Sequence, residues 1–179
     1  GMAVWSEHDT PELRELIGAM RSRRFPIVLV DRYLDGVDCD SVVSDNEAIG
    51  RQLTADLIRA GHRNIAFAGH KEGVSSIVDR YRGFLRALRE AEAIREESSE
   101  AVITVPDVQL VADGYEAVKD AMARRDRPTA FVCIHDLAAA RVAAALERLG
   151  YAVPGDVAFA APDDEHPIEH PVPPMRSLA

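Results

Sequence analysis

Short, continuous apolar runs alternate with segments of helical periodicity along most of this 179-residue chain. A strand that is apolar on both sides must be buried on both sides, which is typical of parallel sheets that carry helices on each face. We therefore predict an α/β fold with doubly wound parallel sheets. The predicted strands cover residues 27–30, 42–44, 65–69, 101–105, 130–134 and 157–161, and the apolar run 3–5 is expected to be the end of a further strand.

The first predicted helix has a clear beginning. Thr10 supplies a hydroxyl N-cap, and Pro11 occupies the first helical position, where its missing N–H costs nothing. Apolar residues then recur at helical spacing and predict one buried stripe. The stripe consists of Leu13, Leu16, Ile17 and Met20.

Polar caps and glycines delimit the later helices. Asp45 is a predicted N-cap for a helix that ends at Gly61, since glycine commonly follows a helix terminus. A further helix is predicted after Gly114. Asp136 is predicted to cap an alanine-rich helix that ends at Gly150.

The charge balance argues against nucleic acid as a direct partner. The formal net charge is -9, whereas affinity for a phosphate backbone comes mainly from lysine and arginine. The sequence starts without the basic and apolar pattern of a secretion signal, and no apolar run reaches the ~18 residues of a membrane span. We therefore expect a cytoplasmic protein that does not contact a membrane and whose two cysteines are reduced thiols.

The motifs of the common nucleotide-binding and hydrolase sites are missing. There is no Gly-x-x-x-x-Gly-Lys-[Ser/Thr], no Gly-x-Gly-x-x-Gly and no Gly-x-Ser-x-Gly. The acidic run 163–166 offers four metal-ligating side chains, but adjacent residues do not easily converge on one ion. We predict no cofactor, no metal site and no enzyme activity.

Polar residues follow the predicted strands at the end where open parallel sheets bind ligands. They are Asp31-Arg32, Gly69-His70, His135-Asp136 and Asp163-Asp164. Carboxylates accept hydrogen bonds from ligand hydroxyls, and an arginine fork bridges carbonyl, hydroxyl or phosphate oxygens. This rim therefore suits a small polar molecule.

Four motifs occur in a characteristic order at the predicted element boundaries. They are Gly61-His62-Arg63, Arg80-x-x-Gly83-Phe84, Val153-Pro154-x-Asp156-Val157 and Asp163-Asp164. Together they resemble the LacI/GalR family of transcriptional regulators, and more narrowly its periplasmic-binding-protein-like effector domain. The resemblance implies a two-lobe architecture with an incomplete first lobe at 3–46, a second lobe at 47–165 and a crossover or tail segment at 166–179.

The same resemblance implies where an effector binds. Arg80 and Asp163 stand at positions that usually contact the effector. His135 stands where the family commonly has an asparagine, and Ser76 and Gln109 fall at two further contact positions. Where the family typically has a glycine and an aromatic residue before the late aspartate, this sequence has Ala161 and Pro162.

Each assignment has an alternative that the sequence leaves open. Arg80 is also readable as a surface residue paired with Asp79 or Glu72, Asp163 as a turn cap, and His135 as an exposed turn residue.

At the level of function, the resemblance implies an effector-sensing and dimerisation module whose ligand is a sugar or nucleoside-like molecule. DNA binding would belong to a helix-turn-helix domain that this sequence does not contain, and the module would form a homodimer. A small-molecule binding protein without regulatory output is the alternative.

Overall fold

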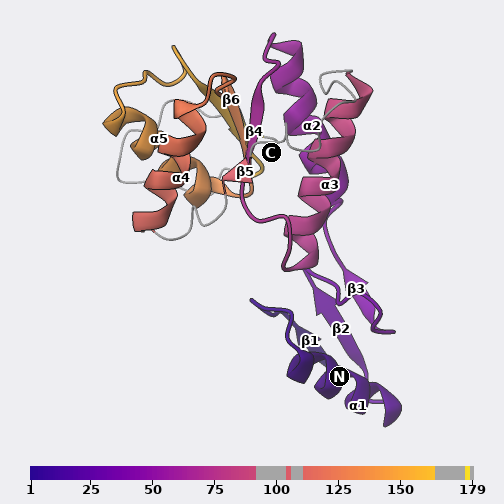
Figure 1. Ribbon diagram of the computed structural model, residues 1–179. Helices are drawn as coiled ribbons and strands as arrows, with labels where there is room; N and C mark the ends of the chain where they lie inside the picture. Colours follow the sequence, from indigo (N-terminus) through magenta and orange to yellow (C-terminus); the bar gives the residue numbers. More distant parts are fainter. Residues whose placement is uncertain (92–103, 106–110, 164–175, 178–179) are drawn as a thin grey trace.

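The computed structural model describes residues 1–91, 104–105, 111–163 and 176–177. Two parallel sheets form two lobes, with the first lobe below the second in Figure 1. The first sheet has the order β1-β2-β3 and the second the order β5-β4-β6-β7-β8. Every pair of neighbouring strands is parallel, which confirms the predicted fold class.

The element bounds follow the predicted alternation. The helices are α1 (Pro11–Ser22), α2 (Asn46–Arg59), α3 (Ser75–Glu90), α4 (Val111–Ala123) and α5 (Asp136–Arg148). The strands are β1 (Met2–Val4), β2 (Ile27–Val30), β3 (Asp40–Val42), β4 (Ile65–Ala68), β5 (Thr104–Val105), β6 (Ala130–Cys133), β7 (Ala158–Ala161) and β8 (Arg176–Ser177).

Helix α1 packs on one face of the first sheet. The Thr10 hydroxyl oxygen accepts from the Leu13 N–H at 3.2 Å, which confirms the predicted cap. Ile17 is fully buried against Ile27 in β2, but Leu16 is 55% exposed. The predicted buried stripe therefore includes one residue too many, because packing on a three-stranded sheet buries only part of the apolar face of the helix.

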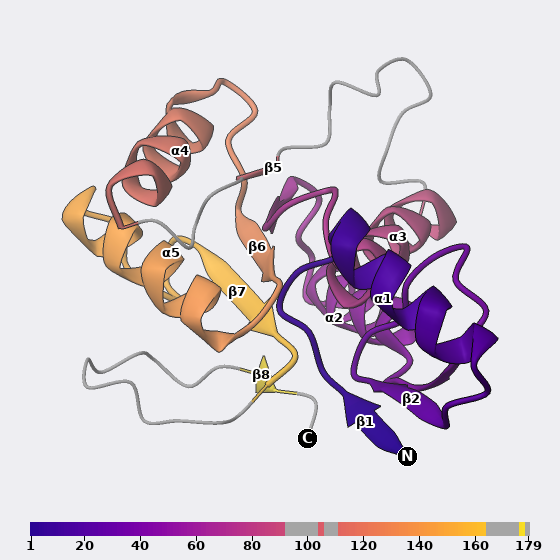
Figure 2. The same ribbon diagram turned by 90° about the horizontal axis from the view of Figure 1, so that it is seen from below.

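The second lobe holds the main core of the described residues. Strands β4 and β6 are buried along their whole length. Helices α2 and α3 cover one face of this sheet, and α4 and α5 cover the other, as Figures 1 and 2 both show. The sheet is thus doubly wound, and the carboxyl ends of its strands face the first lobe.

The backbones of α2 and α3 touch through two glycines. A Cβ on Gly50 would overlap the carbonyl oxygen of Arg80, and a Cβ on Gly83 would overlap that of Glu47. Any side chain at either position would push the helices apart. This contact fixes Arg80 in α3 against the first turn of α2.

The strands predicted at 65–69, 130–134 and 157–161 are each one residue shorter in the structure, and three further predicted boundaries are wrong. The N-cap of α5 is His135 rather than Asp136, because the His135 Nδ1 accepts from the Ala138 N–H at 3.0 Å. Helix α4 begins at Val111, before the buried Gly114, so that glycine lies inside the helix despite its low propensity. Strand β3 ends at Val42 and not at residue 44, because its pairing with β2 ends there.

Tyr33 connects the lobes. Its backbone N–H donates to the Ser75 hydroxyl at 2.9 Å, and its own hydroxyl donates to the Asp79 carboxylate at 3.0 Å. The lobe boundaries 3–46 and 47–165 remain a prediction, and the tail 166–179 lies outside the described residues except for β8. In the described part of the chain, no helix is long and apolar enough to cross a membrane.

Candidate ligand-binding cleft

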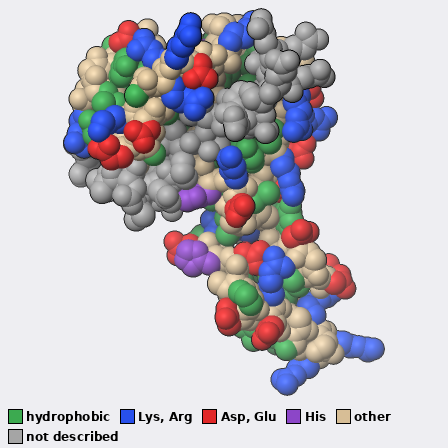
Figure 3. Space-filling view, viewed as in Figure 1, with side chains coloured by type: hydrophobic (Ala, Val, Ile, Leu, Met, Phe, Trp, Pro, Cys, Tyr) green, Lys and Arg blue, Asp and Glu red, His purple; other side chains and the backbone are tan. Residues whose placement is uncertain are grey.

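A cleft of about 1160 Å³ lies between the first lobe and the carboxyl ends of the second lobe's strands. Figure 3 shows the molecule narrowing at this level, where histidine and charged side chains gather. The first lobe contributes Trp5, Glu7, His8, Asp9, Pro11, Arg14, Asp31 and Arg32. The second lobe contributes His70, Glu72, Gly73, Val74, Ser76, Ile77, Arg80, His135, Leu137, Arg141 and Asp163.

Arg80 is a fixed cation in this cleft. Its Nε donates to the Asn46 side-chain oxygen at 2.8 Å, and its Nη1 donates to the Ile134 carbonyl. Burial lowers the pKa of the guanidinium, while the negative charges of Asp163 and Asp31 act in the opposite direction. Arginine nevertheless stays protonated in proteins, so the cleft holds a permanent positive charge.

The alternative of a surface arginine does not hold for Arg80. Asp79, its suggested partner, forms an ion pair with Arg82 at 2.9 Å and accepts from the Tyr33 hydroxyl. The Asn46 that holds Arg80 is only 3% exposed. The Arg80 guanidinium is therefore held in one orientation inside the cleft and not free at the surface.

Asp163 follows β7 by two residues and is half-buried in the cleft. Its charge acts on Arg80, so the cleft places an acceptor and a donor near one another. A ligand hydroxyl can donate a hydrogen bond to the carboxylate and accept one from the guanidinium.

His135 presents its imidazole to the same cleft. Since Nδ1 accepts the cap hydrogen bond, the neutral ring carries its proton on Nε2. Burial lowers the pKa of His135, and the positive charge of Arg80 lowers it further. The ring is therefore a neutral donor near pH 7. Ser76, which is 5% exposed in the first turn of α3, lines the cleft as well.

The structure thus brings together four of the five residues that the sequence assigned to the site. The fifth, Gln109, lies outside the described residues. Their roles in binding remain predictions.

The sequence places Asp31 and Arg32 on the predicted polar rim, but none of the five assigned site residues comes from the first lobe. Asp31 closes β2 with a backbone φ of 70°, in the left-handed region that only a few residue types adopt readily. Its position after an apolar strand was the available signal. Trp5 likewise follows β1, and it is the single tryptophan of the chain.

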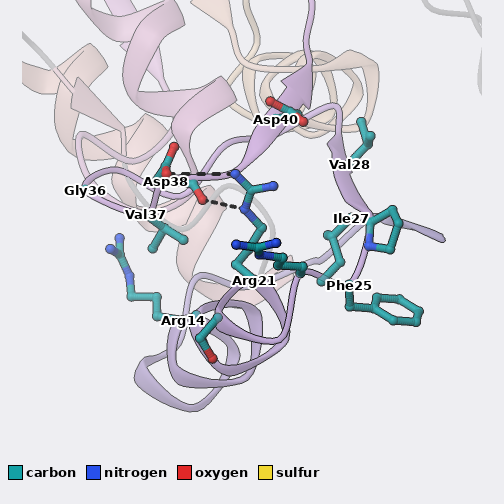
Figure 4. Close-up of a pocket in the computed structure, with 13 residues that line it drawn as sticks. Arg14, Arg21, Phe25, Ile27, Val28, Gly36, Val37, Asp38 and Asp40 are labelled. Atoms are coloured by element: carbon teal, nitrogen blue, oxygen red, sulfur yellow. Dashed lines mark hydrogen bonds and ion pairs between the residues drawn. The ribbon is translucent and has the colours of Figure 1, made fainter.

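A second hollow, of about 820 Å³, lies at the far end of the first lobe between α1 and the β2–β3 segment (Figure 4). Its polar groups bond to one another, as when Arg21 Nε donates to the Asp38 carbonyl at 3.0 Å. None of the predicted site residues lies there.

Residues 164–166 of the acidic run lie outside the described residues. Among the residues that the structure does describe, no cluster of three histidine, cysteine, aspartate or glutamate side chains is arranged to hold a metal ion.

Comparison with known proteins agrees with this architecture. Residues 54–179 match the family model of the periplasmic binding protein-like domain. The arabinose metabolism transcriptional repressor of Geobacillus stearothermophilus is 32% identical over 82% of this chain and 40% of the relative. The HTH-type transcriptional repressor PurR of Mannheimia succiniciproducens is 30% identical over 86% of this chain and 45% of the relative.

Among solved structures, a transcriptional regulator of the LacI family from Burkholderia phymatum superposes with a TM-score of 0.73. It is 28% identical, over 92% of this chain and 57% of that chain. The chain spans about half the length of the curated relatives it matches, and these relatives are transcriptional repressors rather than enzymes. The chain therefore belongs to the periplasmic-binding-protein-like domain family, in which it is homologous to the effector-binding region of LacI-type repressors.

Proposed function

We propose that this chain is the effector-sensing and dimerisation module of a LacI/GalR-like transcriptional regulator, and that its effector binds in the cleft between the lobes. The observation that carries the proposal is the orientation of Arg80. Asn46 and the Ile134 carbonyl hold two of its nitrogens, beside the Asp163 carboxylate. The protein has already met the cost of orienting this side chain, so a ligand gains the interaction without that cost.

The composition of the cleft supports a small polar ligand of the sugar or nucleoside class. Carboxylates and arginines from both lobes face one space, so each wall offers both acceptors and donors. Ligands with several hydroxyls or amides satisfy both kinds of group. The name of the Geobacillus stearothermophilus relative, an arabinose metabolism repressor, is consistent with the sugar alternative.

Binding between two lobes provides a route to regulation. A ligand that contacts both walls stabilises the lobe orientation in which both contacts form. In a complete regulator, this orientation would set the affinity of DNA-binding domains elsewhere in the protein. We therefore favour a cytoplasmic regulator over a carrier without regulatory output, since the relatives named above are repressors.

Thermal unfolding tests the proposal. Ligands that bind the native state stabilise it and thereby raise the unfolding temperature. At a ligand concentration of ~100 times Kd, this stabilisation amounts to about 2.7 kcal/mol. A panel of pentoses, hexoses and nucleosides should include at least one compound that stabilises the wild type but not Arg80→Ala. Arg89→Ala is the matched control, since Arg89 is an exposed arginine of the same helix away from the cleft. The proposal is contradicted if a compound stabilises the wild type, Arg80→Ala and Arg89→Ala equally, or if no compound of the panel stabilises the wild type.

A further inference from the structure

We infer that Asn46 is a positioning residue that connects Arg80 in the cleft to the backbone between the two lobes, so that a ligand contact at Arg80 changes the lobe orientation. Asn46 itself does not line the cleft. The inference rests on the proposed function, because it takes the Arg80 cleft as the effector site. It goes further by assigning the step that carries ligand binding out of that site.

Asn46 stands where the chain passes from the first lobe to the second. Strand β3 of the first lobe ends at Val42, and α2 of the second lobe begins at Asn46. Residues 43–45, the joining segment, connect these two elements, and Figure 1 shows the chain running upward from β3 into α2. A rotation of one lobe against the other therefore changes the backbone of the joining segment or the bonds at its ends.

The two ends of the Asn46 amide bond to different parts of the molecule. Its Oδ1 accepts from the Arg80 Nε at 2.8 Å, and its Nδ2 donates to the Ser44 carbonyl, in the joining segment, at 3.1 Å. Because an arginine nitrogen only donates and a carbonyl only accepts, these partners fix which end of the amide is the oxygen. The Asn46 backbone N–H donates to the same carbonyl at 2.8 Å. One residue thus joins the cation of the cleft to the joining segment.

Capping of α2 does not explain the Asn46 side chain. The N-cap is Asp45, whose carboxylate accepts from the Ala48 N–H at 3.0 Å. The Asn46 amide bonds instead to a carbonyl before the helix and to a side chain of α3. Because Asn46 is only 3% exposed, losing either bond leaves a buried polar atom without a partner.

The contact between α2 and α3 directs a movement of Arg80 toward Asn46. The Arg80 carbonyl lies so close to Gly50 that a Cβ there would overlap it, so the backbones of the two helices move as one unit. A ligand that draws the guanidinium into the cleft therefore displaces the Arg80 side chain alone. The buried Asn46 amide is bonded to that side chain, and the Ser44 carbonyl is the next atom along.

The first lobe's wall of the cleft is tied to the same stretch of backbone. The Asp31 N–H donates to the Val42 carbonyl at 2.9 Å, and Asp31 lines the cleft. The carbonyls of Val42 and Ser44 therefore hold one residue from each wall. A ligand that contacts Arg80 and Asp31 together acts on the joining segment from both ends, which favours one lobe orientation.

Asn46→Asp separates the two bonds of the amide. A carboxylate still accepts from the Arg80 Nε but has no hydrogen to donate to the Ser44 carbonyl. Asn46→Ala removes both bonds and gives a second variant for the same measurements. Asn64→Asp is the matched control, because Asn64 is an exposed asparagine of the second lobe that does not line the cleft. Thermal unfolding confirms that each variant is folded.

The distance between the lobes is the readout that a merely structural role would not change. Spin labels on two introduced cysteines, Glu15→Cys in α1 and Glu147→Cys in α5, report this distance by double electron–electron resonance. Both positions are exposed, and Cys39→Ser in the parent protein removes the half-buried thiol. An excess of unlabelled protein suppresses signals between subunits.

The first arm of the experiment uses no ligand. We expect the distance distribution to broaden in Asn46→Asp and in Asn46→Ala, because the side chain no longer holds the Ser44 carbonyl. The distribution of Asn64→Asp should match that of the parent protein.

The second arm adds ligand. The probes are D-ribose, L-arabinose, D-glucose, D-galactose, adenosine and guanosine, each at about 10 mM, which saturates even a site with a Kd near 1 mM. A probe that binds should shift the distance in the parent protein and in Asn64→Asp, but not in Asn46→Asp. By calorimetry, Asn46→Asp should bind this probe within about threefold of the parent protein, since Arg80 keeps its bond, and Asn46→Ala at least about tenfold more weakly.

Failure of this inference is distinguishable from failure of the proposed function. If a probe binds in an Arg80-dependent manner and Asn46→Asp shows the full ligand-induced shift, the cleft is the effector site and Asn46 does not carry the coupling. Equal losses of affinity in Asn46→Asp and Asn46→Ala also overturn the inference, because the Ser44 bond would then serve binding itself. If no probe binds, the proposed function is contradicted, and unchanged ligand-free distances in both Asn46 variants overturn the link to the joining segment.

Discussion

The hydroxyl of Tyr33, in the loop after β2, donates to the carboxylate of Asp79 on α3 at 3.0 Å. This bond crosses from one lobe to the other beside the proposed cleft. Burial raises the pKa of Tyr33, and the negative charge of Asp79 has the same effect, so the hydroxyl stays protonated and remains a donor. The bond restrains the angle between the lobes independently of any ligand.

Removing this hydroxyl should loosen the junction. Tyr33→Phe loses one hydrogen bond to a charged acceptor, so we expect the free energy of unfolding to fall by about 1 kcal/mol. Urea denaturation measures the loss. A double-mutant cycle with Asp79→Asn should show a coupling of at least ~0.5 kcal/mol. Strictly additive effects would mean that the bond does not contribute in solution.

The glycine contact between α2 and α3 predicts a specific sensitivity. Gly83→Ala places a methyl group against the backbone of α2, so we expect a destabilisation of about 1–3 kcal/mol. Ligand affinity should fall as well, because Arg80 and Asn46 lie on these two helices. Gly18→Ala in α1 is the control. A Cβ there meets nothing within 4 Å, so alanine should be neutral or stabilising. Equal effects at the two positions would contradict this packing.

Much of this architecture follows from local sequence signals. The Thr10 cap and the buried runs of β4 and β6 were predicted because capping chemistry and continuous apolar runs are encoded by neighbouring residues. The His135 cap was missed because an imidazole accepts a cap hydrogen bond only in one tautomer, a choice that depends on its surroundings.

The contacts that assemble the site from both lobes could not be predicted from local sequence patterns. The Arg80–Asn46 bond joins residues 34 positions apart, and the Trp5–Asp31 bond joins residues 26 positions apart. Their proximity depends on the packing of whole elements rather than on any local pattern. The exposure of Leu16 likewise depends on how wide a face the sheet offers to α1.

The lowered pKa of His135 predicts a stability that decreases in mild acid. Burial and the Arg80 charge disfavour the protonated ring in the folded state, whereas the unfolded chain binds the proton near the ordinary value of 6.5. The free energy of unfolding should therefore have its full value above pH 6.5 and decrease as the pH falls below this value. His135→Asn keeps a capping side chain but does not titrate, so it should reduce this dependence.

Part of the pH dependence should persist in His135→Asn, because burial also lowers the pKa of His62. Thermal unfolding from about pH 8 to about pH 5 checks the prediction. An unchanged pH profile in His135→Asn would show that His135 is not the group responsible.

The exposed edge of the first sheet predicts self-association. Within the described residues β1 pairs with β2 alone, Met2 in this strand is exposed, and so is Leu16 in α1 of the same lobe. An open strand with apolar neighbours is a template for association, and a symmetric dimer is the simplest way to cover it. Analytical ultracentrifugation at about 50 μM should show a dimer or larger species. A compact monomer of 19.6 kDa would contradict this prediction.

Isothermal titration calorimetry of Arg80→Ala and Asp163→Ala, with the compound that stabilises the wild type, tests the central claim most directly. Each variant removes a charged partner from a partly buried site, so we predict that binding weakens by roughly 1.5–3 kcal/mol, or about ten- to 150-fold. Arg89→Ala should bind as the wild type does. Normal affinity in both Arg80→Ala and Asp163→Ala would show that the effector does not bind in the cleft between the lobes.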